Sequence, residues 1–194
     1  MKNLVFVLIL VILAAGSVFA QEDTIKHWVS GELDIFGVGV RYEYMLSPKI
    51  SIGANAYTSA LIMSGANVFN VIGCFYPFEK AFLIELGLGY GSVKGSGTAT
   101  LVSKETGAES EYGGVTTTGF VISPGLSWKI DVGKQGGFFL QPGFKLPIAI
   151  GKQVPLEGGL FAAMFGYNKD EYTVKDQSGT SASFIIHFNM GFAF

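Results

Sequence analysis

The sequence predicts an all-β protein: a single transmembrane, antiparallel, up-and-down β-barrel of eight strands. Three observations lead to this prediction. Apolar and polar residues alternate in one segment after another, charged residues fall on only one face of each segment, and short connections alternate with long ones. A count of ten strands stays open as an alternative, because Leu160–Tyr167 and Glu171–Lys175 can add one more hairpin.

The composition separates a barrel from other folds. Hydrophobic residues make up 49% of the chain and charged residues 14%, yet no segment after the first twenty residues is a run of about twenty apolar residues. This pattern leaves a soluble β-sandwich or a transmembrane barrel. The polar faces mix large polar residues with many of the 27 glycines, which suits the narrow interior of a small barrel better than a sandwich core. The single Cys74 forbids an internal disulfide.

The amino-terminal segment has the features of an export signal. Lys2 precedes an apolar run from Leu4 to Ala15, and Val18-Phe19-Ala20 has the small residues of a cleavage site. The run is short for a membrane span, although a retained anchor is the alternative. We therefore expect residues 1–20 to be a cleaved signal peptide and residues 21–194 to form one barrel domain.

Alternation sorts the charged residues onto one face. A Lys or Arg on a lipid-facing side of a barrel costs about 2–4 kcal/mol at the bilayer midplane, which explains the sorting. The charged residues expected to point into the lumen are Arg41, Glu43, Glu85, Lys129 and Lys145. Isolated charges in a narrow lumen are costly, so they should pair or keep water. They can form a closed salt-bridge plug, or they can line a narrow or gated polar conduit.

The last twelve residues show the alternation most clearly. One face is apolar, and its members are Phe184, Ile186, Phe188, Met190, Phe192 and Phe194. The other face includes His187 and Asn189. We expect this segment to be a lipid-facing strand that pairs with the first strand and closes the barrel.

The connections fix the topology. Short turns are expected at Ser47–Lys49, Pro77–Lys80 and Asp131–Gly137, with longer links between them. Small outer-membrane barrels have short periplasmic turns and long external loops. Parity then requires a strand within Lys26–Leu33 ahead of the strand Phe36–Leu46, and it brings both termini to the end with the short turns.

Aromatic residues are expected in two girdles, one at each membrane interface. The girdle at the short turns comprises Tyr42, Tyr44, Tyr76, Phe78, Phe82, Trp128, Phe138, Phe192 and Phe194, and the other comprises Trp28, Phe36, Phe69, Tyr90, Phe120 and Phe184. In the segment Asn67–Tyr76 we expect Gly73 to face inward and Ile72, Cys74 and Tyr76 to face lipid. A turn centred near Gly133 would place Trp128 opposite Phe138 and Pro124 opposite Pro142, with a bulge or a gap in the hydrogen-bond ladder there.

Two segments carry a resemblance to a known class. The stretch Gly39–Gly53 looks like the first tight hairpin of small bacterial outer-membrane barrels, the class of outer membrane proteins A, X and W. Residues Phe188, Met190, Phe192 and Phe194 look like the carboxy-terminal signal that the barrel assembly machinery reads. The resemblance implies the outer membrane of a diderm bacterium, with both termini periplasmic. It implies no particular activity, and we expect no peptidoglycan-binding domain.

Little in the sequence points to catalysis. Only His27 and His187 are present, and no Ser lies beside His187 at active-site spacing, so we expect no enzyme and no catalytic residue. Metal-ligand spacing is absent, and no cofactor is expected. The glycine-rich run Gly87–Gly91 lies in a strand and lacks the helix that would hold phosphate. A net charge of −2 without a basic patch gives no reason to expect nucleic acid.

The longer links hold the remaining candidates. Ser92–Gly114 can extend a hairpin above the membrane as a β-ribbon that offers an edge to partners. A possible apolar loop patch consists of Leu160, Phe161, Met164 and Phe165. The expected function is therefore that of an outer-membrane barrel with a largely filled lumen and a structural or surface-interaction role through its loops. The alternative is a narrow channel for small hydrophobic solutes. The expected partners are outer-membrane lipid, the assembly machinery during insertion, and an extracellular ligand or host surface.

Overall fold

The computed structural model describes residues 26–34, 37–59, 65–78, 81–132, 137–156 and 170–194. The predicted signal peptide, Phe36 and the apolar loop patch at residues 160–165 lie outside this part of the chain. Every regular element within it is a strand. No helix among the described residues is long and apolar enough to cross a membrane.

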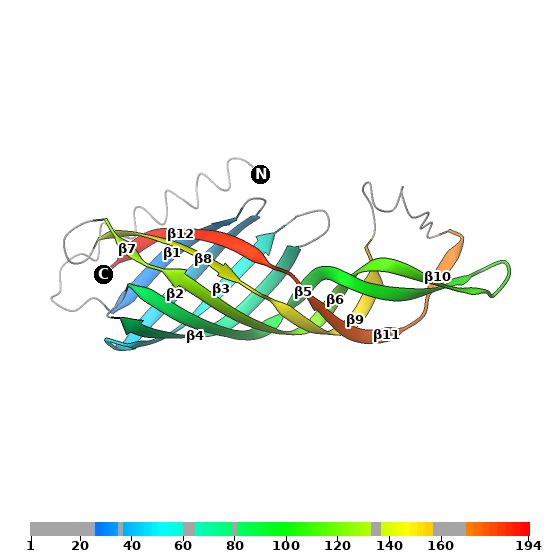
Figure 1. The fold of residues 1–194 in the computed structure, drawn as a ribbon, viewed down its shortest axis with the longest axis horizontal. Coiled ribbons are helices and arrows are strands. Elements are labelled where there is room, and N and C mark those ends of the chain that lie inside the picture. Colours follow the sequence, from blue (N-terminus) through cyan, green and yellow to red (C-terminus); the bar gives the residue numbers. More distant parts are fainter. Residues whose placement is uncertain (1–25, 35–36, 60–64, 79–80, 133–136, 157–169) are drawn as a thin grey trace.

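Twelve strand segments form one antiparallel sheet. Their bounds are β1 (His27–Asp34), β2 (Gly37–Ser47), β3 (Ile50–Ser59), β4 (Gly65–Phe78), β5 (Phe82–Ser103), β6 (Glu109–Trp128), β7 (Ile130–Asp131), β8 (Phe138–Lys145), β9 (Ile148–Pro155), β10 (Tyr172–Val174), β11 (Gln177–Ala182) and β12 (Ile185–Ala193). Three pairs of segments form interrupted strands of the barrel wall: β6 with β7, β8 with β9, and β11 with β12. The wall therefore has eight strands, and Figure 1 shows them side by side.

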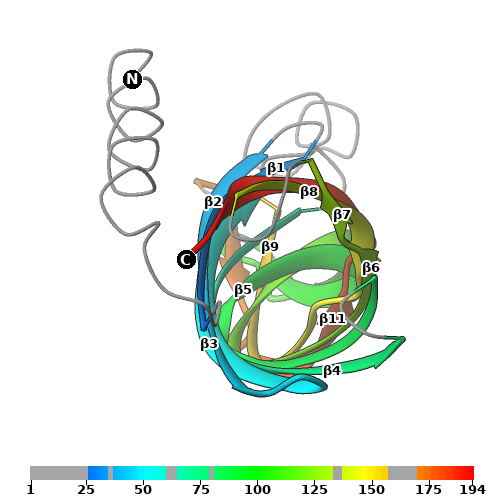
Figure 2. The same ribbon diagram turned by 90° about the vertical axis from the view of Figure 1, so that its left-hand side faces the viewer.

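The sheet closes on itself. Each wall strand pairs with the next along the chain, and β12 pairs with β1 from Trp28↔Ala193 to Asp34↔His187. Backbone bonds reinforce this seam, because the amides of Lys26 and His27 donate to the carbonyl of Phe194. Figure 2 looks along the barrel and shows the ring. The predicted eight-strand up-and-down barrel is confirmed, as are the first strand near Lys26–Leu33 and the closing last strand.

The strands are strongly tilted against the barrel axis. The hydrogen-bonded row that starts at Glu32 passes through Gly39, Tyr57, Val68, Gly91, Gly119 and Gly151 to Gly179. Gly179 lies ten residues before Asn189, the residue that pairs with Glu32 on the same wall strand. One circuit therefore climbs by ten residues away from the short turns. Such a stagger belongs to strands tilted by roughly 35–45°, and eight strands leave an interior just wide enough for side chains.

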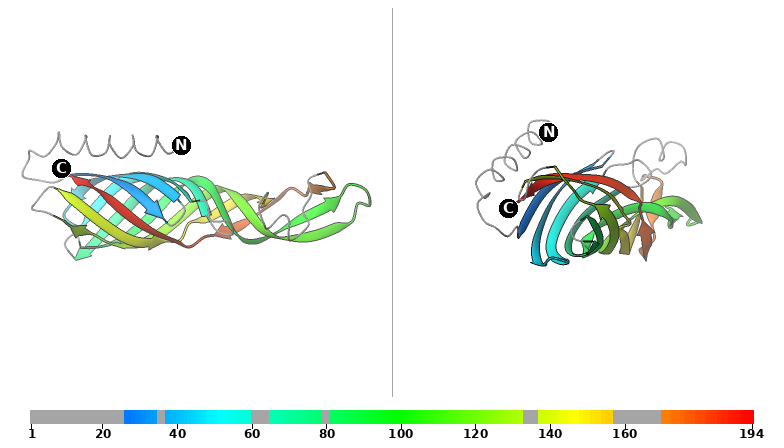
Figure 3. Two further views of the ribbon diagram at one scale, coloured as in Figure 1. Left: turned by 90° about the horizontal axis from the view of Figure 1, so that it is seen from above. Right: turned by 60° about the vertical axis from the view of Figure 1, so that its left-hand side comes forward.

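Strands β5 and β6 continue beyond the other wall strands as a long ribbon. They stay paired up to Val102↔Glu109, and this ribbon projects far from the barrel in Figures 1 and 3. The predicted β-ribbon in Ser92–Gly114 is therefore present. Strand β10 pairs with β5 there, from Tyr172↔Ser103 to Val174↔Leu101. It does not enter the ring, and Leu160–Tyr167 lies outside the described residues. Because eight wall strands already close the ring, the ten-strand alternative is wrong.

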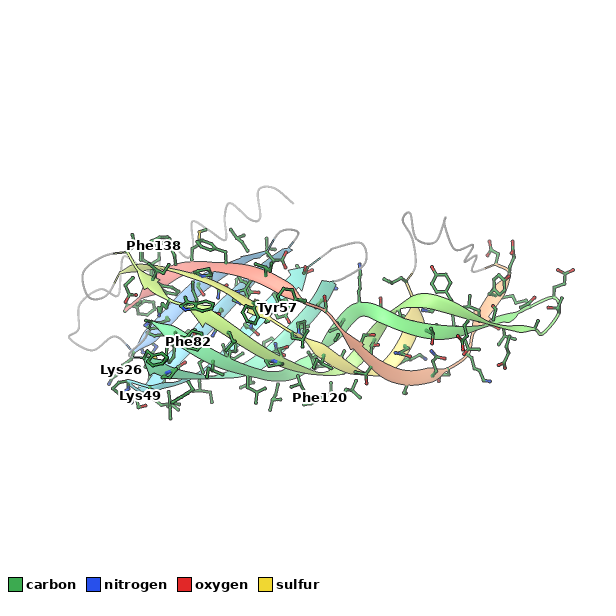
Figure 4. The ribbon with its side chains drawn as sticks, in the orientation of Figure 1. Lys26, Lys49, Tyr57, Phe82, Phe120 and Phe138 are labelled. Atoms are coloured by element: carbon green, nitrogen blue, oxygen red, sulfur yellow. The ribbon has the colours of Figure 1, made fainter. Side chains whose placement is uncertain are left out.

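Burial follows the predicted alternation on most strands. On β12 the residues Ile185, His187, Asn189 and Ala193 are buried, whereas Ile186 and Phe188, and Phe184 just before the strand, are exposed on the outside. Figure 4 shows Phe82 and Phe138 near the end with the short turns and Phe120 farther toward the ribbon. The apolar outside and mixed inside are as expected for these strands.

The expected facing of β4 is wrong. Asn70, Ile72, Cys74 and Tyr76 are all buried inside, and Gly73 lies on the outer face, where it pairs with the exposed residues Ile52 and Leu86 of the adjacent strands. The alternation is intact but shifted by one residue, because burying the Asn70 amide matters more than keeping Ile72 on the outer face. Tyr76 therefore does not belong to the aromatic girdle at the short turns.

Two further expectations need correction. Trp28 is buried in the lumen near the short turns, since it lies beside Ala193 and Glu43, and it is not part of the far girdle. The register between the β6–β7 strand and β8 differs from the predicted one: Ile130 pairs with Leu140, and the Pro124 carbonyl accepts a hydrogen bond from the amide of Leu146. On its other side, Pro142 pairs with Phe188 of β12. Pro124 and Pro142 are therefore not opposite each other, although the regular ladder is interrupted beside Pro124, between Gly125↔Lys145 and Ile122↔Ile148.

Candidate functional site

The lumen gathers the charged residues that alternation placed on the inner face. Arg41, Glu43, Glu85, Lys129 and Lys145 are each at most 6% exposed. They come from four wall strands, because β2 supplies the first two and β5, the β6–β7 strand and β8 supply one each. The charges therefore meet only because the sheet closes into a ring.

Arg41 bridges two carboxylates. Its Nε donates to Glu43 Oε1 at 2.7 Å, and its Nη1 donates to Glu85 Oε2. Its Nη2 lies 3.1 Å from Cys74 Sγ. Strands β2 and β5 are three places apart in the ring, so the guanidinium reaches across the lumen. Paired, buried guanidinium and carboxylate groups are the arrangement that makes charge tolerable inside a protein.

Glu43 is held on its other oxygen as well. The hydroxyls of Ser51 and Tyr76 each donate to Oε2 at 2.7 Å. These bonds bring β3 and β4 into the same network. Glu43 and Arg41 together thus join four consecutive wall strands, β2 to β5, into one polar cluster.

A second ion pair lies on the opposite side of the ring. Lys145 Nζ donates to Glu32, and the same ammonium lies 3.3 Å from the centroid of the Tyr57 ring on β3. Both partners of the ion pair are at most 3% exposed at their side chains. A cation over the face of an aromatic ring is attracted by the ring quadrupole, and this attraction is strongest where water is excluded.

Lys129 lies nearest the short turns, among aromatic rings. Its ammonium sits over the Trp28 ring and 4.1 Å from the centroid of the Phe139 ring. Trp28 also meets Tyr76 edge to face, with ring centroids 5.4 Å apart. The apolar cluster around them comprises Trp28, Met45, Ile72, Cys74, Tyr76, Leu83, Phe139 and Ala193.

A second apolar cluster lies on the far side of the charged layer. Its members are Tyr57, Ala66, Val68, Val93, Val121, Ala149 and Ile185. Beyond it, toward the ribbon, the hydroxyls of Thr117 and Ser181 are 2.6 Å apart and Gln153 donates to Thr117. The described interior is therefore layered along the axis: an aromatic layer, a charged layer, an aliphatic layer and a hydroxyl–amide layer.

His187 also lies inside the barrel. It is 3% exposed, and its Nδ1 lies 3.2 Å from Asn189 Oδ1 on the same strand. His27, in contrast, lies at the outer rim, where it contacts the Tyr42 hydroxyl at 2.9 Å and stacks on Phe194. The described residues hold no group of three His, Cys, Asp or Glu side chains placed to bind a metal.

Sequence reasoning missed several members of the network. Glu32 was not singled out, although Trp28, Ser30 and Glu32 alternate with Val29 and Leu33 and so mark the inner face of β1. Tyr76 was assigned to the wrong face. The pairing of Lys145 with Glu32 and Tyr57 had no signal in the sequence, because it depends on how far the strands are staggered around the ring.

Fold and lumen together define a class: a closed eight-stranded antiparallel barrel with an apolar outside and a mixed polar and apolar inside. The sequence matches no protein-family model and no curated protein. Among solved structures, the chain is similar to the N-terminal β-barrel domain of OprF from Pseudomonas aeruginosa, with 11% identity and a TM-score of 0.43. The similarity covers 88% of this chain and 96% of that one. The closed barrel is established by the strand pairing of this chain itself.

Proposed function

We propose that the protein is an integral outer-membrane barrel with a closed lumen, which presents its ribbon outside the cell. The observation that supports membrane insertion most strongly is the outer surface of the barrel. Large apolar side chains exposed there include Val40, Ile52, Phe69, Val71, Ile84, Leu86, Leu88, Phe120, Ile150 and Ile186. Monomeric soluble proteins rarely expose so continuous an apolar surface, whereas a barrel in lipid requires it.

The same rules suggest the orientation. The tight turns and Phe194 lie at one end, and the long β5–β6 ribbon lies at the other. Outer-membrane barrels keep short turns in the periplasm and long connections outside. We infer that the ribbon, with the short strand β10 along its β5 edge, faces the extracellular medium and offers a surface to a ligand or a host component.

An epitope tag can test this orientation. A tag inserted between Glu105 and Thr106, at the ribbon tip, should bind its antibody on intact cells. A matched tag between Pro48 and Lys49 should bind only after the outer membrane is permeabilised. The opposite pattern would invert the proposed orientation, and equal labelling on intact cells would contradict insertion.

We propose that side chains fill the lumen, which supports a structural or surface role over transport. The network around Arg41 and the pair Lys145–Glu32 lie between two apolar layers, so the described interior holds side chains where a porin would hold water. The competing use of the same charges is a gate that opens a narrow conduit. The channel for hydrophobic solutes depends on residues 160–165, which lie outside the described residues, and gains no further support.

Conductance in planar bilayers tests the filled lumen. The purified protein should show no single-channel steps, and neither should the variant Arg41→Ala/Lys129→Ala, since the aromatic and aliphatic layers remain. A water-filled porin reconstituted in the same way is the positive control. Steps in the unmodified protein would overturn the closed lumen, and steps in the variant alone would identify a gate.

We further propose that β12 carries the signal for the assembly machinery, through Phe188, Met190, Phe192 and Phe194. Replacing Phe194 with Ser should lower the amount of protein in the outer membrane several-fold, while refolding into detergent stays unchanged. Phe82→Ser is the control, because Phe82 lies on the outside near the same end of the barrel and packs on Trp128. Equal losses in both variants would mean that the residue matters only for stability.

A further inference from the structure

On the strands from β3 to β9, the apolar surface of the barrel ends at a continuous row of outward polar residues. The row consists of Thr58, Asn67, Ser92, Thr118 and Lys152. Each member pairs with the next across the sheet, and Thr58 Oγ1 donates to Asn67 Oδ1. Directly below it on three neighbouring strands are Phe69, Tyr90 and Phe120, which are also consecutive partners and are 58%, 65% and 49% exposed. An aromatic row under a polar row is what a membrane interface selects.

This border is not level. A hydrogen-bonded row runs across tilted strands, so it climbs along the axis by about 3 Å per strand for a spacing of about 4.8 Å and a tilt of about 40°. The stagger of ten residues shows that the climb goes from β3 toward β9 and away from the short turns. Four steps separate Thr58 from Lys152, which therefore lies about 12 Å higher along the axis.

The opposite border is nearly level. The row Ile52, Gly73, Leu86 and Pro124 climbs three steps, or about 9 Å, from β3 to β6. Toward the short turns, Lys49 lies three residues from Ile52 along β3, and Val132 lies eight residues from Pro124 along the β6–β7 strand. At about 2.5 Å of axial rise per residue, these two positions come within about 4 Å of one level.

The number of outward apolar positions on each strand shows the same difference in height of the apolar surface. Below the polar row, β3 has four such positions and the β8–β9 strand has seven: Ile50, Ile52, Ala54 and Ala56 against Phe138, Leu140, Pro142, Phe144, Leu146, Ile148 and Ile150. With two residues per position, the apolar heights are about 20 Å and about 35 Å. The usual band of an outer-membrane barrel is about 25 Å tall.

We propose that this apolar belt is a wedge, and that lipids beside β3 and β4 form a thinner layer than lipids beside β8 and β9. The inference rests on the proposed membrane insertion and adds an interaction surface to it, whose partner is the bilayer itself. A mismatch of this kind costs fractions of a kcal/mol per Å, so lipid can follow the protein border rather than cross it. Rigid tilting of the barrel does not remove the wedge, because the two borders are not parallel.

Depth-dependent fluorescence quenching tests the wedge. Single-cysteine variants Thr58→Cys, Lys152→Cys, Lys49→Cys and Val132→Cys are prepared in a Cys74→Ser background and labelled with a small fluorophore. Each full-length protein is reconstituted into phosphatidylcholine vesicles that carry quenchers at shallow or deep acyl positions. Leu86→Cys, which lies in the middle of the belt on β5, is the control for insertion, and heat-shifted gel migration confirms that each variant is folded.

The wedge predicts that the labels at positions 58 and 152 report the same shallow depth, despite their axial difference of about 12 Å, and that the labels at 49 and 132 also agree. A label at 152 beyond reach of the quenchers, with 58 at the surface, would show a flat bilayer and overturn the inference. Different depths at 49 and 132 would show a tilted barrel and overturn it too. Absence of quenching at position 86 would instead refute membrane insertion.

Discussion

Replacing Arg41 with Ala is expected to lower the free energy of unfolding by about 3–5 kcal/mol. The guanidinium is the common partner of Glu43 and Glu85, and all three side chains are at most 2% exposed. Without it, two carboxylates remain buried close together, each with its desolvation cost uncompensated. Denaturant titration of the protein refolded in detergent or vesicles measures the change.

Two further variants make this prediction specific. Lys152→Ala removes one partner of the exposed pair Lys152–Asp176, whose side chains are 64% and 81% exposed, and should cost no more than about 1 kcal/mol. Arg41→Met combined with Glu43→Gln and Glu85→Gln should recover most of the lost stability, because it removes the unpaired charges together. A cost below about 1 kcal/mol for Arg41→Ala would mean that water already solvates this layer.

Introducing Arg at Leu86 should also be costly. Leu86 is half-exposed on the outside, and it is the middle of the five outward apolar positions of β5, from Phe82 to Tyr90. In the proposed orientation it lies near the bilayer midplane, where Arg costs about 2–4 kcal/mol. The measurement is the unfolding free energy in vesicles.

Ser92→Arg is the matched control for this substitution. Ser92 is an outward residue on the same strand, in the polar row where the apolar belt ends. Near an interface Arg costs only about 0–1 kcal/mol. Equal effects at positions 86 and 92, or no effect at either, would contradict a lipid-facing belt on β5.

The sequence predicted the architecture because a lipid-facing strand constrains every second residue. On β2 and β12 this constraint marked both faces correctly, from Arg41 inside to Phe188 outside. On β4 it failed, since Ile72 and Tyr76 are as apolar as lipid-facing residues and only Asn70 marked the inner face. The predicted register between β6 and β8 was also wrong, because alternation shows which face a residue occupies but not which residues of adjacent strands pair.

The candidate site, too, could be predicted only in part from the sequence. That Arg41, Glu43, Glu85, Lys129 and Lys145 share the inner face follows from alternation along single strands. Which of them meet is set by the stagger between strands, which single-strand patterns do not contain. Arg41 therefore meets Glu85 from three strands away, and Lys145 meets Glu32 from two strands away and Tyr57 from four.

The central claim is that the chain forms a closed barrel that is inserted in the outer membrane. The most direct measurement is electrophoresis of the outer-membrane fraction in dodecyl sulfate, with and without boiling. A closed barrel resists the detergent until it is heated, so the unboiled protein should migrate as a distinct compact band that shifts to the unfolded position after boiling. A protein that is missing from the outer-membrane fraction, or whose migration never shifts, would contradict the claim.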